Sequence, residues 1–345
     1  RAQLEQGIFT PETISVGDLF AGALLPGLLL VFFYILYQVM RATLDPKSSP
    51  AMPADDSIPA GELYRRTLRA LVPPTALIVA VMGSILGGIA TPTEAAALGA
   101  IGAILLAGER AGGVKLPVRL ASAATIALLL LTFFMDLRTA RNEISGTDQI
   151  GIWFAYALCA VIAFGLAAAI WRLWFNGVIA EVTQSTARIT SMVFVILIGA
   201  ALFSLVFRGL GGDDMVHEFL SSMPGGATGA LIIVMLVMFV LGFFLDFIEI
   251  IFVVVPIVAP ILLVLGIDPI WLGVMMAINL QTSFLTPPFG FALFYLRGVA
   301  PDSVTTMQIY RGAIPFVGLQ LVALAAVAFF PALATWLPRL IFGTM

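Results

Sequence analysis

Charged residues are scarce in this chain of 345 residues. Only 11% of the residues are charged, 61% are hydrophobic, and the formal net charge is −3. A soluble domain keeps polar residues on the outer face of most elements, and the long apolar runs here leave no such face. The strict alternation of polar and apolar residues that a transmembrane β-barrel needs is also missing. The composition predicts an all-α, polytopic membrane protein that lies in the lipid bilayer. We expect no nucleic acid among its partners.

Cysteine and histidine occur once each. Cys159 lies in an apolar run with no second cysteine to pair with, and His217 lies in a polar segment expected to be a loop. No Cys/His cluster can hold a zinc ion or a haem. A nucleophile with its base is missing as well, and the pair Asp213-Asp214 lacks the second aspartate-rich motif of a diphosphate site. We therefore expect neither an enzyme nor a cofactor.

Apolar runs and polar breaks predict the order of the membrane segments. A helix from Pro92 to about Gly108 is expected to begin at the capping-box sequence Thr91-Pro-Thr-Glu94. The segment 41–70 is Pro-rich and is expected to be a solvated loop, 176–188 is expected to lie on the membrane surface, and 208–228 is expected to be a loop. Spans are expected at about 18–40, 71–90, 118–135, 151–172, 189–207 and 312–337.

Basic residues set the orientation of these segments. If the first span runs from outside to inside, twelve Lys and Arg residues fall on the cytoplasmic side and five on the other side. This distribution follows the positive-inside rule.

The segment 229–265 carries the sequence Gly242-Phe-Phe-Leu-Asp246-Phe-Ile-Glu249 between two apolar runs. Each run is at the short limit for crossing a bilayer, so a re-entrant hairpin is favoured over two full crossings. An intramembrane carboxylate is a candidate functional group, and we expect Asp246 to act at a site near the hairpin tip. Local capping or pairing at the tip is the alternative. Glu249 shares a face with Asp246 only if the tip is helical.

A second break lies in Asn279-Leu-Gln-Thr-Ser-Phe-Leu-Thr-Pro-Pro-Phe-Gly290, inside a helix expected at about 270–297. Pro287 and Pro288 have no amide hydrogen, so the carbonyls of Ser283 and Phe284 lose their helical partners. In hydrocarbon such a break is tolerated only where it is buried in protein or lines a cavity. Freed carbonyls beside amide and hydroxyl side chains suit a desolvated hard cation such as sodium.

Polar side chains of this segment follow helical spacing. Asn279, Thr282, Ser283 and Thr286 fall on one face that leads to the Pro-Pro break. Hydrogen bonding between helices is the alternative use of such residues in membranes. We expect a cation or substrate site, with sodium at Asn279, Ser283 and Thr286. The candidate binding residues are Gly242, Asp246, Asn279, Thr282, Ser283, Phe284, Thr286, Pro287, Pro288 and Gly290, the two glycines serving either close packing or the approach of carbonyls to an ion.

Four stretches resemble the large membrane (M) subunit of tripartite ATP-independent periplasmic (TRAP) transporters. They are 87–97, Ile198-Gly-Ala-Ala-Leu-Phe-Ser204, Gly242-Phe-Phe-Leu-Asp246 and, most specifically, 279–290. The resemblance covers most of about 15–340. It implies a sodium-coupled elevator transporter of organic acids in the bacterial inner membrane. Its implied partners are a small four-helix membrane (Q) subunit and a periplasmic substrate-binding (P) protein.

The resemblance also implies two inverted repeats, each with a hairpin and a discontinuous helix, of which this chain carries the second. The first repeat's hairpin and its Pro-Pro-Ser break are not found, so a C-terminal portion of a long variant is expected. The expected organisation is scaffold and arm helices at 1–115 with a cytoplasmic loop at 41–70, an extra pair of transmembrane helices at 116–175, a transport-domain repeat at 176–311 with a hairpin at about 229–265 and a broken helix at about 271–297, and a C-terminal transmembrane helix at 312–345. A proton-coupled transporter of the same architecture and a non-conducting structural subunit remain open alternatives.

Overall fold

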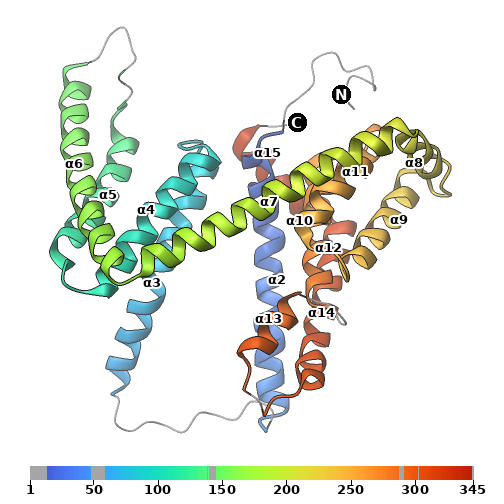
Figure 1. Ribbon diagram of the computed structural model, residues 1–345, viewed down its shortest axis with the longest axis horizontal. Helices are drawn as coiled ribbons and strands as arrows, with labels where there is room; N and C mark the ends of the chain where they lie inside the picture. Colours follow the sequence, from blue (N-terminus) through green and yellow to red (C-terminus); the bar gives the residue numbers. More distant parts are fainter. Residues whose placement is uncertain are drawn as a thin grey trace. The chain divides into compact units, whose positions relative to one another are not determined.

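The structure is a computed structural model that describes residues 14–47, 59–137, 139, 145–286, 291–301 and 303–343. All regular elements within these ranges are helices, which confirms the predicted all-α fold (Figure 1). Seven of these helices are long and apolar enough to cross a membrane: Val16–Leu44, Gly61–Leu86, Lys115–Thr132, Gly146–Phe175, Val178–Gly209, Phe247–Val264 and Thr306–Phe329. The protein is a multi-pass membrane protein.

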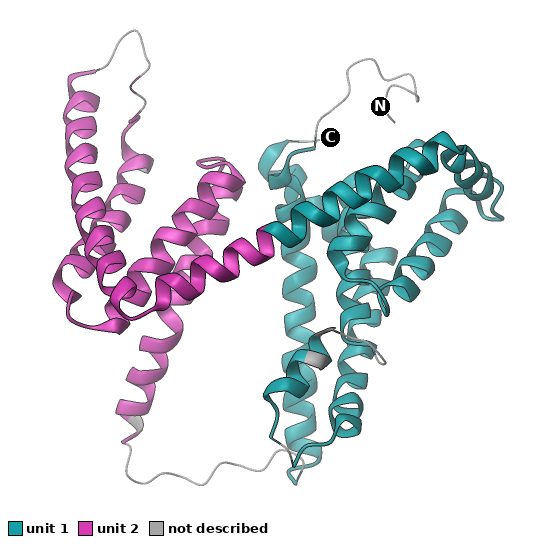
Figure 2. Ribbon diagram, in the orientation of Figure 1, with its two compact units in different colours: residues 1–54, 191–345 teal, residues 55–190 magenta. Residues whose placement is uncertain are grey.

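The chain forms two compact units (Figure 2). Residues 1–54 and 191–345 make one unit, and residues 55–190 make the other. The boundary falls inside α7 (Val178–Gly209), a single helix that includes most of the expected surface segment 176–188. Residues 178–190 contain neither proline nor glycine, so the helix continues through them, and the membrane-surface location of 176–188 stays a prediction.

The unit of residues 55–190 consists of α3 (Ala60–Leu86), α4 (Pro92–Ala111), α5 (Lys115–Phe134) and α6 (Gly146–Phe175). The expected loop at 41–70 is too long, since residues 60–70 belong to α3. Glu62 forms ion pairs with Arg65 at 2.7 Å and with Arg66 at 3.0 Å. Pairs three and four residues apart stabilise a helix, so the polar composition that suggested a loop is the exposed first part of α3.

The capping box predicted at Thr91 is confirmed. The Glu94 carboxylate accepts hydrogen bonds from the Thr91 amide at 2.8 Å and from its hydroxyl at 2.9 Å. The Glu94 amide donates to the Thr91 hydroxyl at 3.4 Å in return. These hydrogen bonds hold the pKa of the Glu94 carboxyl below its ordinary value. Glu94 is therefore a structural residue that starts α4.

Small residues allow the helices of this unit to pack closely. A Cβ atom on Gly108 of α4 would lie 2.7 Å from the Cβ of Ala169 in α6, and Ala169 is fully buried. Gly165 of α6 approaches the backbone of Pro117 in α5 in the same way. Without a hydrophobic driving force between helices in lipid, such backbone contact is a main source of association.

We expect Gly108→Ala to destabilise the protein by about 1–3 kcal/mol, because the added methyl group overpacks the α4–α6 contact. Thermal unfolding of the purified protein in detergent measures this loss. Gly83→Ala in α3 is the matched control, since a Cβ there meets no atom within 4 Å. Equal unfolding temperatures for the two variants would contradict the close contact.

The unit of residues 1–54 and 191–345 holds the remaining described helices. Its second half differs from expectation in two places. Residues 212–221 of the expected loop 208–228 form a short helix. The expected last span 312–337 is divided at Phe330 and Pro331, because proline cannot donate the next helical hydrogen bond. The helices are α2 (Val16–Leu44), α8 (Gly212–Ser221), α9 (Gly226–Leu241), α10 (Phe247–Glu249), a π-helical turn (Ile250–Val254), α11 (Val255–Val264), α12 (Pro269–Phe284), α13 (Phe291–Val299), α14 (Thr306–Phe329) and α15 (Ala332–Phe342).

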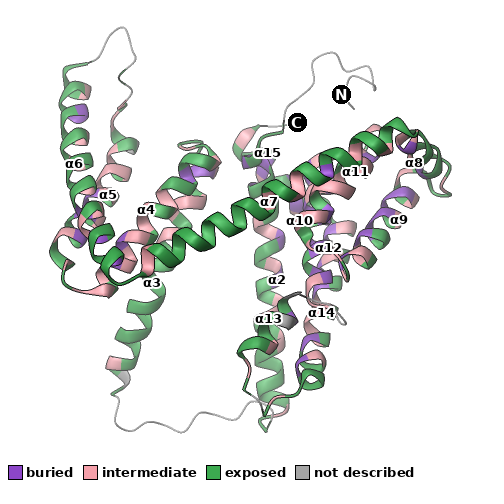
Figure 3. Cartoon of the chain, in the orientation of Figure 1, coloured by how far each residue is buried: buried purple, intermediate pink, exposed green. Residues whose placement is uncertain are grey.

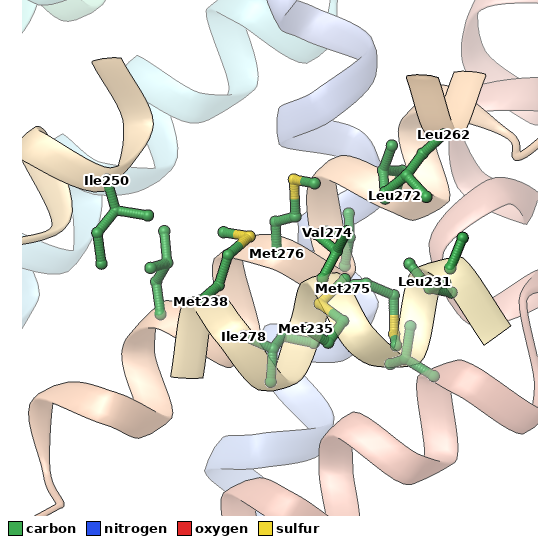
Figure 4. Packing of buried hydrophobic residues seen from close by; sticks show 14 of the residues in the cluster. Leu231, Met235, Met238, Ile250, Leu262, Leu272, Val274, Met275, Met276 and Ile278 are labelled. Carbon is green, nitrogen blue, oxygen red and sulfur yellow. The ribbon is translucent and has the colours of Figure 1, made fainter. Parts of the chain in front are cut away.

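The main core of this unit lies between α9, α11 and α12. Methionines from two helices meet there: Met235 and Met238 of α9, and Met275 and Met276 of α12, all at most 8% exposed (Figure 4). By contrast, α7 has one buried residue, Ala200, although its side chains are largely apolar (Figure 3). Apolar surface of this extent is typical of helices that face lipid or a partner subunit.

α2 crosses this core at Gly22. A Cβ atom there would lie 2.7 Å from Cγ2 of Ile270 in α12 and 2.9 Å from the carbonyl oxygen of Ala334 in α15. The first predicted span therefore packs directly against α12 and α15.

Candidate functional site

The polar residues predicted on one face of α12 are buried. Asn279 is 2% exposed, Thr282 is fully buried and Ser283 is 1% exposed. The structure describes seven buried polar or charged residues, and these three lie within five consecutive positions. Burying an unpaired polar group costs free energy, so the cluster has to satisfy its hydrogen bonds within the protein.

The hydroxyl groups of this cluster and of Thr286 donate their hydrogen bonds to backbone carbonyls of α12. Thr282 donates to the Ile278 carbonyl at 2.8 Å, Ser283 to the Leu280 carbonyl at 2.7 Å, and Thr286 to the Thr282 carbonyl at 2.8 Å. A hydroxyl that donates its hydrogen to the backbone keeps its oxygen lone pairs for another partner. The last turn of α12 and the residues directly after it thus carry three hydroxyl oxygens that can accept a hydrogen or bind a cation.

Asn279 connects α12 to α9. Its Nδ2 atom donates to the Met235 carbonyl of α9 at 2.8 Å, 44 residues away in sequence. Hydrogen bonding between helices was the alternative role expected for this polar face, and Asn279 makes such a bond. It uses only one donor of the amide, so Asn279 can both join the helices and offer its Oδ1 atom to a ligand.

Gly242 lies directly against Ser283. A Cβ atom on Gly242 would clash with the Ser283 side chain, and Gly242 itself is buried. The φ angle of Gly242 is −65°, so the absence of a side chain, rather than an unusual backbone angle, is what this position requires. Two candidates predicted from separate stretches, 41 residues apart, therefore meet.

The turn after α9 also contacts the end of α12 through aromatic rings. Phe247 of α10 and Phe284 of α12 lie with ring centroids 5.4 Å apart at 71°. Phe247 follows Asp246, whose carboxylate accepts a hydrogen bond from the Phe247 amide at 2.7 Å and caps α10. Asp246 is half-buried. The described geometry thus shows the local cap, and a role for Asp246 in transport stays a prediction.

The carbonyl groups at the end of α12 differ in part from expectation. The Ser283 carbonyl accepts a hydrogen bond from the Thr286 amide at 3.1 Å, so it gains a partner three residues on in place of the lost one. The Phe284 carbonyl has no such replacement, because the residues three and four positions later are both prolines. The Phe284 carbonyl therefore loses both of its local helical donors. Pro287, Pro288 and Gly290 lie outside the described residues.

A π-helical turn over Ile250–Val254 was not expected from the sequence. The Val255 amide reaches the Ile250 carbonyl five residues back, immediately before Pro256, which has no amide hydrogen. Such turns are common at functional sites. Pro256 was the available signal, but proline alone does not distinguish a π-helical turn from a kink.

Together these contacts bring the end of α9 and the start of α10 onto the last two turns of α12 (Figure 1). α11 then returns to pack against α8, which precedes α9, so α9 to α11 form a pair of short helices joined at 242–246. We call residues 226–264 the helix pair and Gly242–Asp246 its tip.

The sequence matches the family model described as "Tripartite ATP-independent periplasmic transporter, DctM component" over residues 8–137 and 150–333. The chain belongs to this family. The resemblance seen in the four short stretches is thereby confirmed over most of the chain.

Curated relatives agree with this membership. The chain is 28% identical over 330 residues to the C4-dicarboxylate TRAP transporter large permease protein DctM of Vibrio cholerae, which covers 96% of this chain and 62% of the relative. It is 25% identical over 328 residues to the ectoine TRAP transporter large permease protein TeaC of Halomonas elongata, with 95% and 61% covered. The isethionate TRAP transporter permease protein DctMQ of Oleidesulfovibrio alaskensis is 24% identical over 319 residues, with 92% and 40% covered. The chain spans about three fifths of the length of the first two relatives.

Proposed function

We propose that the chain is the membrane subunit of a secondary transporter that imports an organic acid together with sodium across the bacterial inner membrane. The observation that carries this proposal is the meeting of the helix-pair tip with the interrupted end of α12, where Gly242 contacts Ser283 beside buried Asn279 and Thr282. Hydroxyl and carbonyl oxygens at a helix break are the ligands that transporters use for sodium.

Sodium would be held by Asn279, Ser283 and Thr286, joined by the carbonyl of Phe284. Each of these groups can present an oxygen without breaking a hydrogen bond that the structure describes. The positive charge of the bound ion would attract a substrate carboxylate to the same helix break. This arrangement accounts for coupling, because neither ion is stable in the site without the other.

Movement of the site is proposed to follow an elevator mechanism, in which the helix pair enters the membrane as a re-entrant hairpin and travels with α12. Three ties support rigid movement: the hydrogen bond from Asn279 to Met235, the contact of Gly242 with Ser283, and the ring contact of Phe247 with Phe284.

A periplasmic substrate-binding (P) protein and a small membrane (Q) subunit are the proposed partners. The relatives are named as large permeases of TRAP transporters for C4-dicarboxylate and ectoine, and one is named DctMQ. These names support an organic acid or a related small polar solute as the substrate class. Partner binding would use apolar surface such as that of α7.

The test is uptake into proteoliposomes that contain the complete transporter, with a panel of organic acids and the binding protein outside. We expect uptake only with an inward sodium gradient. Uptake driven by acid pH without sodium would favour the proton-coupled alternative, for which the half-buried carboxylate of Asp246 is the candidate group. No flux under any gradient would favour a structural subunit.

Thr286→Val is expected to raise the sodium concentration for half-maximal uptake about tenfold. The variant replaces the hydroxyl oxygen by a methyl group at nearly constant volume. Initial uptake rates at increasing sodium concentrations measure the change. Thr335→Val in α15 is the matched control, since its hydroxyl also donates to the carbonyl four residues earlier, at 3.2 Å, away from the site. Identical sodium dependence in both variants would remove Thr286 from the ion site.

A further inference from the structure

A groove in the unit of residues 55–190 is not used by the proposed transport site. It has a volume of about 830 Å³ and lies between residues 66–78 of α3, the second half of α4 and the start of α5. This volume is within the range of small-molecule sites. Of its fourteen lining residues five are basic and one, Glu109, is acidic.

The basic residues gather at one end of the groove. Arg66 pairs with Glu62 at 3.0 Å and Arg119 with Glu109 at 2.9 Å. Arg69, Arg110 and Lys115 are exposed and form no ion pair with any residue in the described part of the chain. Three basic residues on three helices, without an ion pair in the described part of the chain, therefore line the same groove.

Beyond this end the groove becomes apolar. Pro73, Leu77 and Ile78 continue along α3, and Ala103 and Leu106 line the α4 side. Eight residues separate Arg69 from Leu77, which corresponds to about 12 Å along the helix axis at 1.5 Å per residue. The groove thus has the polarity of an amphiphile, with a site for negative charge at one end and a hydrocarbon track beside it.

Backbone acceptors are also available at the charged end. Pro73 and Pro74 have no amide hydrogens, so the carbonyls of Arg69 and Ala70 lose their donors four residues later. Both residues line the groove. A ligand with hydroxyl groups near its negative charge could donate hydrogen bonds to these carbonyls.

The position of the groove agrees with a lipid ligand. α3 and α5 are candidate membrane spans. Arg69 lies just before the apolar part of α3, Lys115 is the first residue of α5, and Arg110 lies in the last turn of α4. The positive-inside rule places this end at the cytoplasmic leaflet. Basic pockets between membrane helices on that side are suited to anionic lipid head groups.

We propose that this groove binds one anionic glycerophospholipid, with its phosphate at Arg69, Arg110 and Lys115 and an acyl chain along Pro73, Leu77 and Leu106. Head-group hydroxyls donate to the carbonyls of Arg69 and Ala70. The bound lipid then fills a gap between α3 and α4 that side chains leave open, so it acts as a structural component of this unit.

The test is native mass spectrometry of the purified protein in detergent, titrated with phosphatidylglycerol and with phosphatidylcholine of identical acyl chains. We expect tight binding of one phosphatidylglycerol and weak binding of phosphatidylcholine. The variant Arg69→Gln/Arg110→Gln/Lys115→Gln should bind phosphatidylglycerol at least about tenfold more weakly, since each basic side chain near a membrane surface adds to the attraction. The control Lys47→Gln/Arg188→Gln/Arg311→Gln removes three exposed basic residues outside the groove and should bind like the wild type.

Ala103→Trp tests the acyl-chain track without changing the charge. Ala103 is exposed and lines the groove, so the indole can occupy the track while the helices stay in place. We expect a similar loss of phosphatidylglycerol binding, with an unchanged unfolding temperature in lipid-free detergent. The proposal is overturned if the groove triple variant binds like the wild type, if the control triple loses as much, if Ala103→Trp binds normally, or if glycerol phosphate binds as tightly as the lipid.

Discussion

Replacing Gly242 by alanine is expected to reduce the uptake rate on the order of 100-fold. A displacement of binding groups by about 1 Å can lower a rate by this factor. The added Cβ atom would clash with the Ser283 side chain, so the tip of the helix pair has to move away from α12. Initial uptake rates in proteoliposomes measure the loss. Surface expression and unfolding temperature are recorded with them, since a misfolded variant would also be inactive.

Gly318→Ala in α14 is the control for this experiment, since a Cβ there meets nothing within 4 Å. It should transport like the wild type. The double variant Gly242→Ala/Ser283→Gly removes the clash and is expected to recover the unfolding temperature but not sodium-dependent uptake, because the Ser283 oxygen is lost. Full activity of Gly242→Ala alone would show that the close contact is not needed for transport.

Asn279→Ala is expected to abolish sodium-dependent uptake and to destabilise the protein by about 1–2 kcal/mol. The stability change follows from the lost hydrogen bond to the Met235 carbonyl of α9. The loss of uptake follows from the removal of an oxygen ligand at a buried position. Uptake rates and the protection from thermal unfolding by sodium measure the two effects separately.

Trp271→Phe separates ligation from helix connection in the same experiment. Trp271 also lies on α12, and its Nε1 atom donates to the Val327 carbonyl of α14 at 2.8 Å, so the variant loses a comparable interhelical hydrogen bond at the other end of the helix. It should keep the sodium response. If Trp271→Phe and Asn279→Ala behave alike, the amide of Asn279 is a structural tie and the ion site lies elsewhere.

Much of the fold could be predicted because long apolar runs in the sequence indicate membrane helices. The start of α4 was predictable from Thr91 and Glu94, since a capping box is a local pattern. The start of α3 was missed because Glu62, Arg65 and Arg66 look like a loop until their spacing is considered. The division between α14 and α15 was missed because Pro331 lies inside a continuous apolar run, where composition gives no boundary.

The candidate site was predictable in its residues but not in its contacts. The polar stripe on α12 follows from helical spacing, which is a property of one segment. The meeting of Gly242 with Ser283 and of Phe247 with Phe284 depends on how two segments pack, which spacing within either segment does not contain. Asp246 shows where prediction from sequence ends. The sequence around this carboxylate is the same whether it caps a helix or binds a ligand.

The methionine-rich contact between α9 and α12 has a consequence for how the site is adjusted. Met235, Met238, Met275 and Met276 have unbranched side chains with three rotatable bonds, so their packing adapts to small shifts of one helix along the other at little cost. The contact of Gly242 with Ser283 allows no such shift without a clash or a gap. The methionine contact tolerates small shifts along the helices and the Gly242–Ser283 contact does not, so the proposed ion site would set the register of α9 against α12.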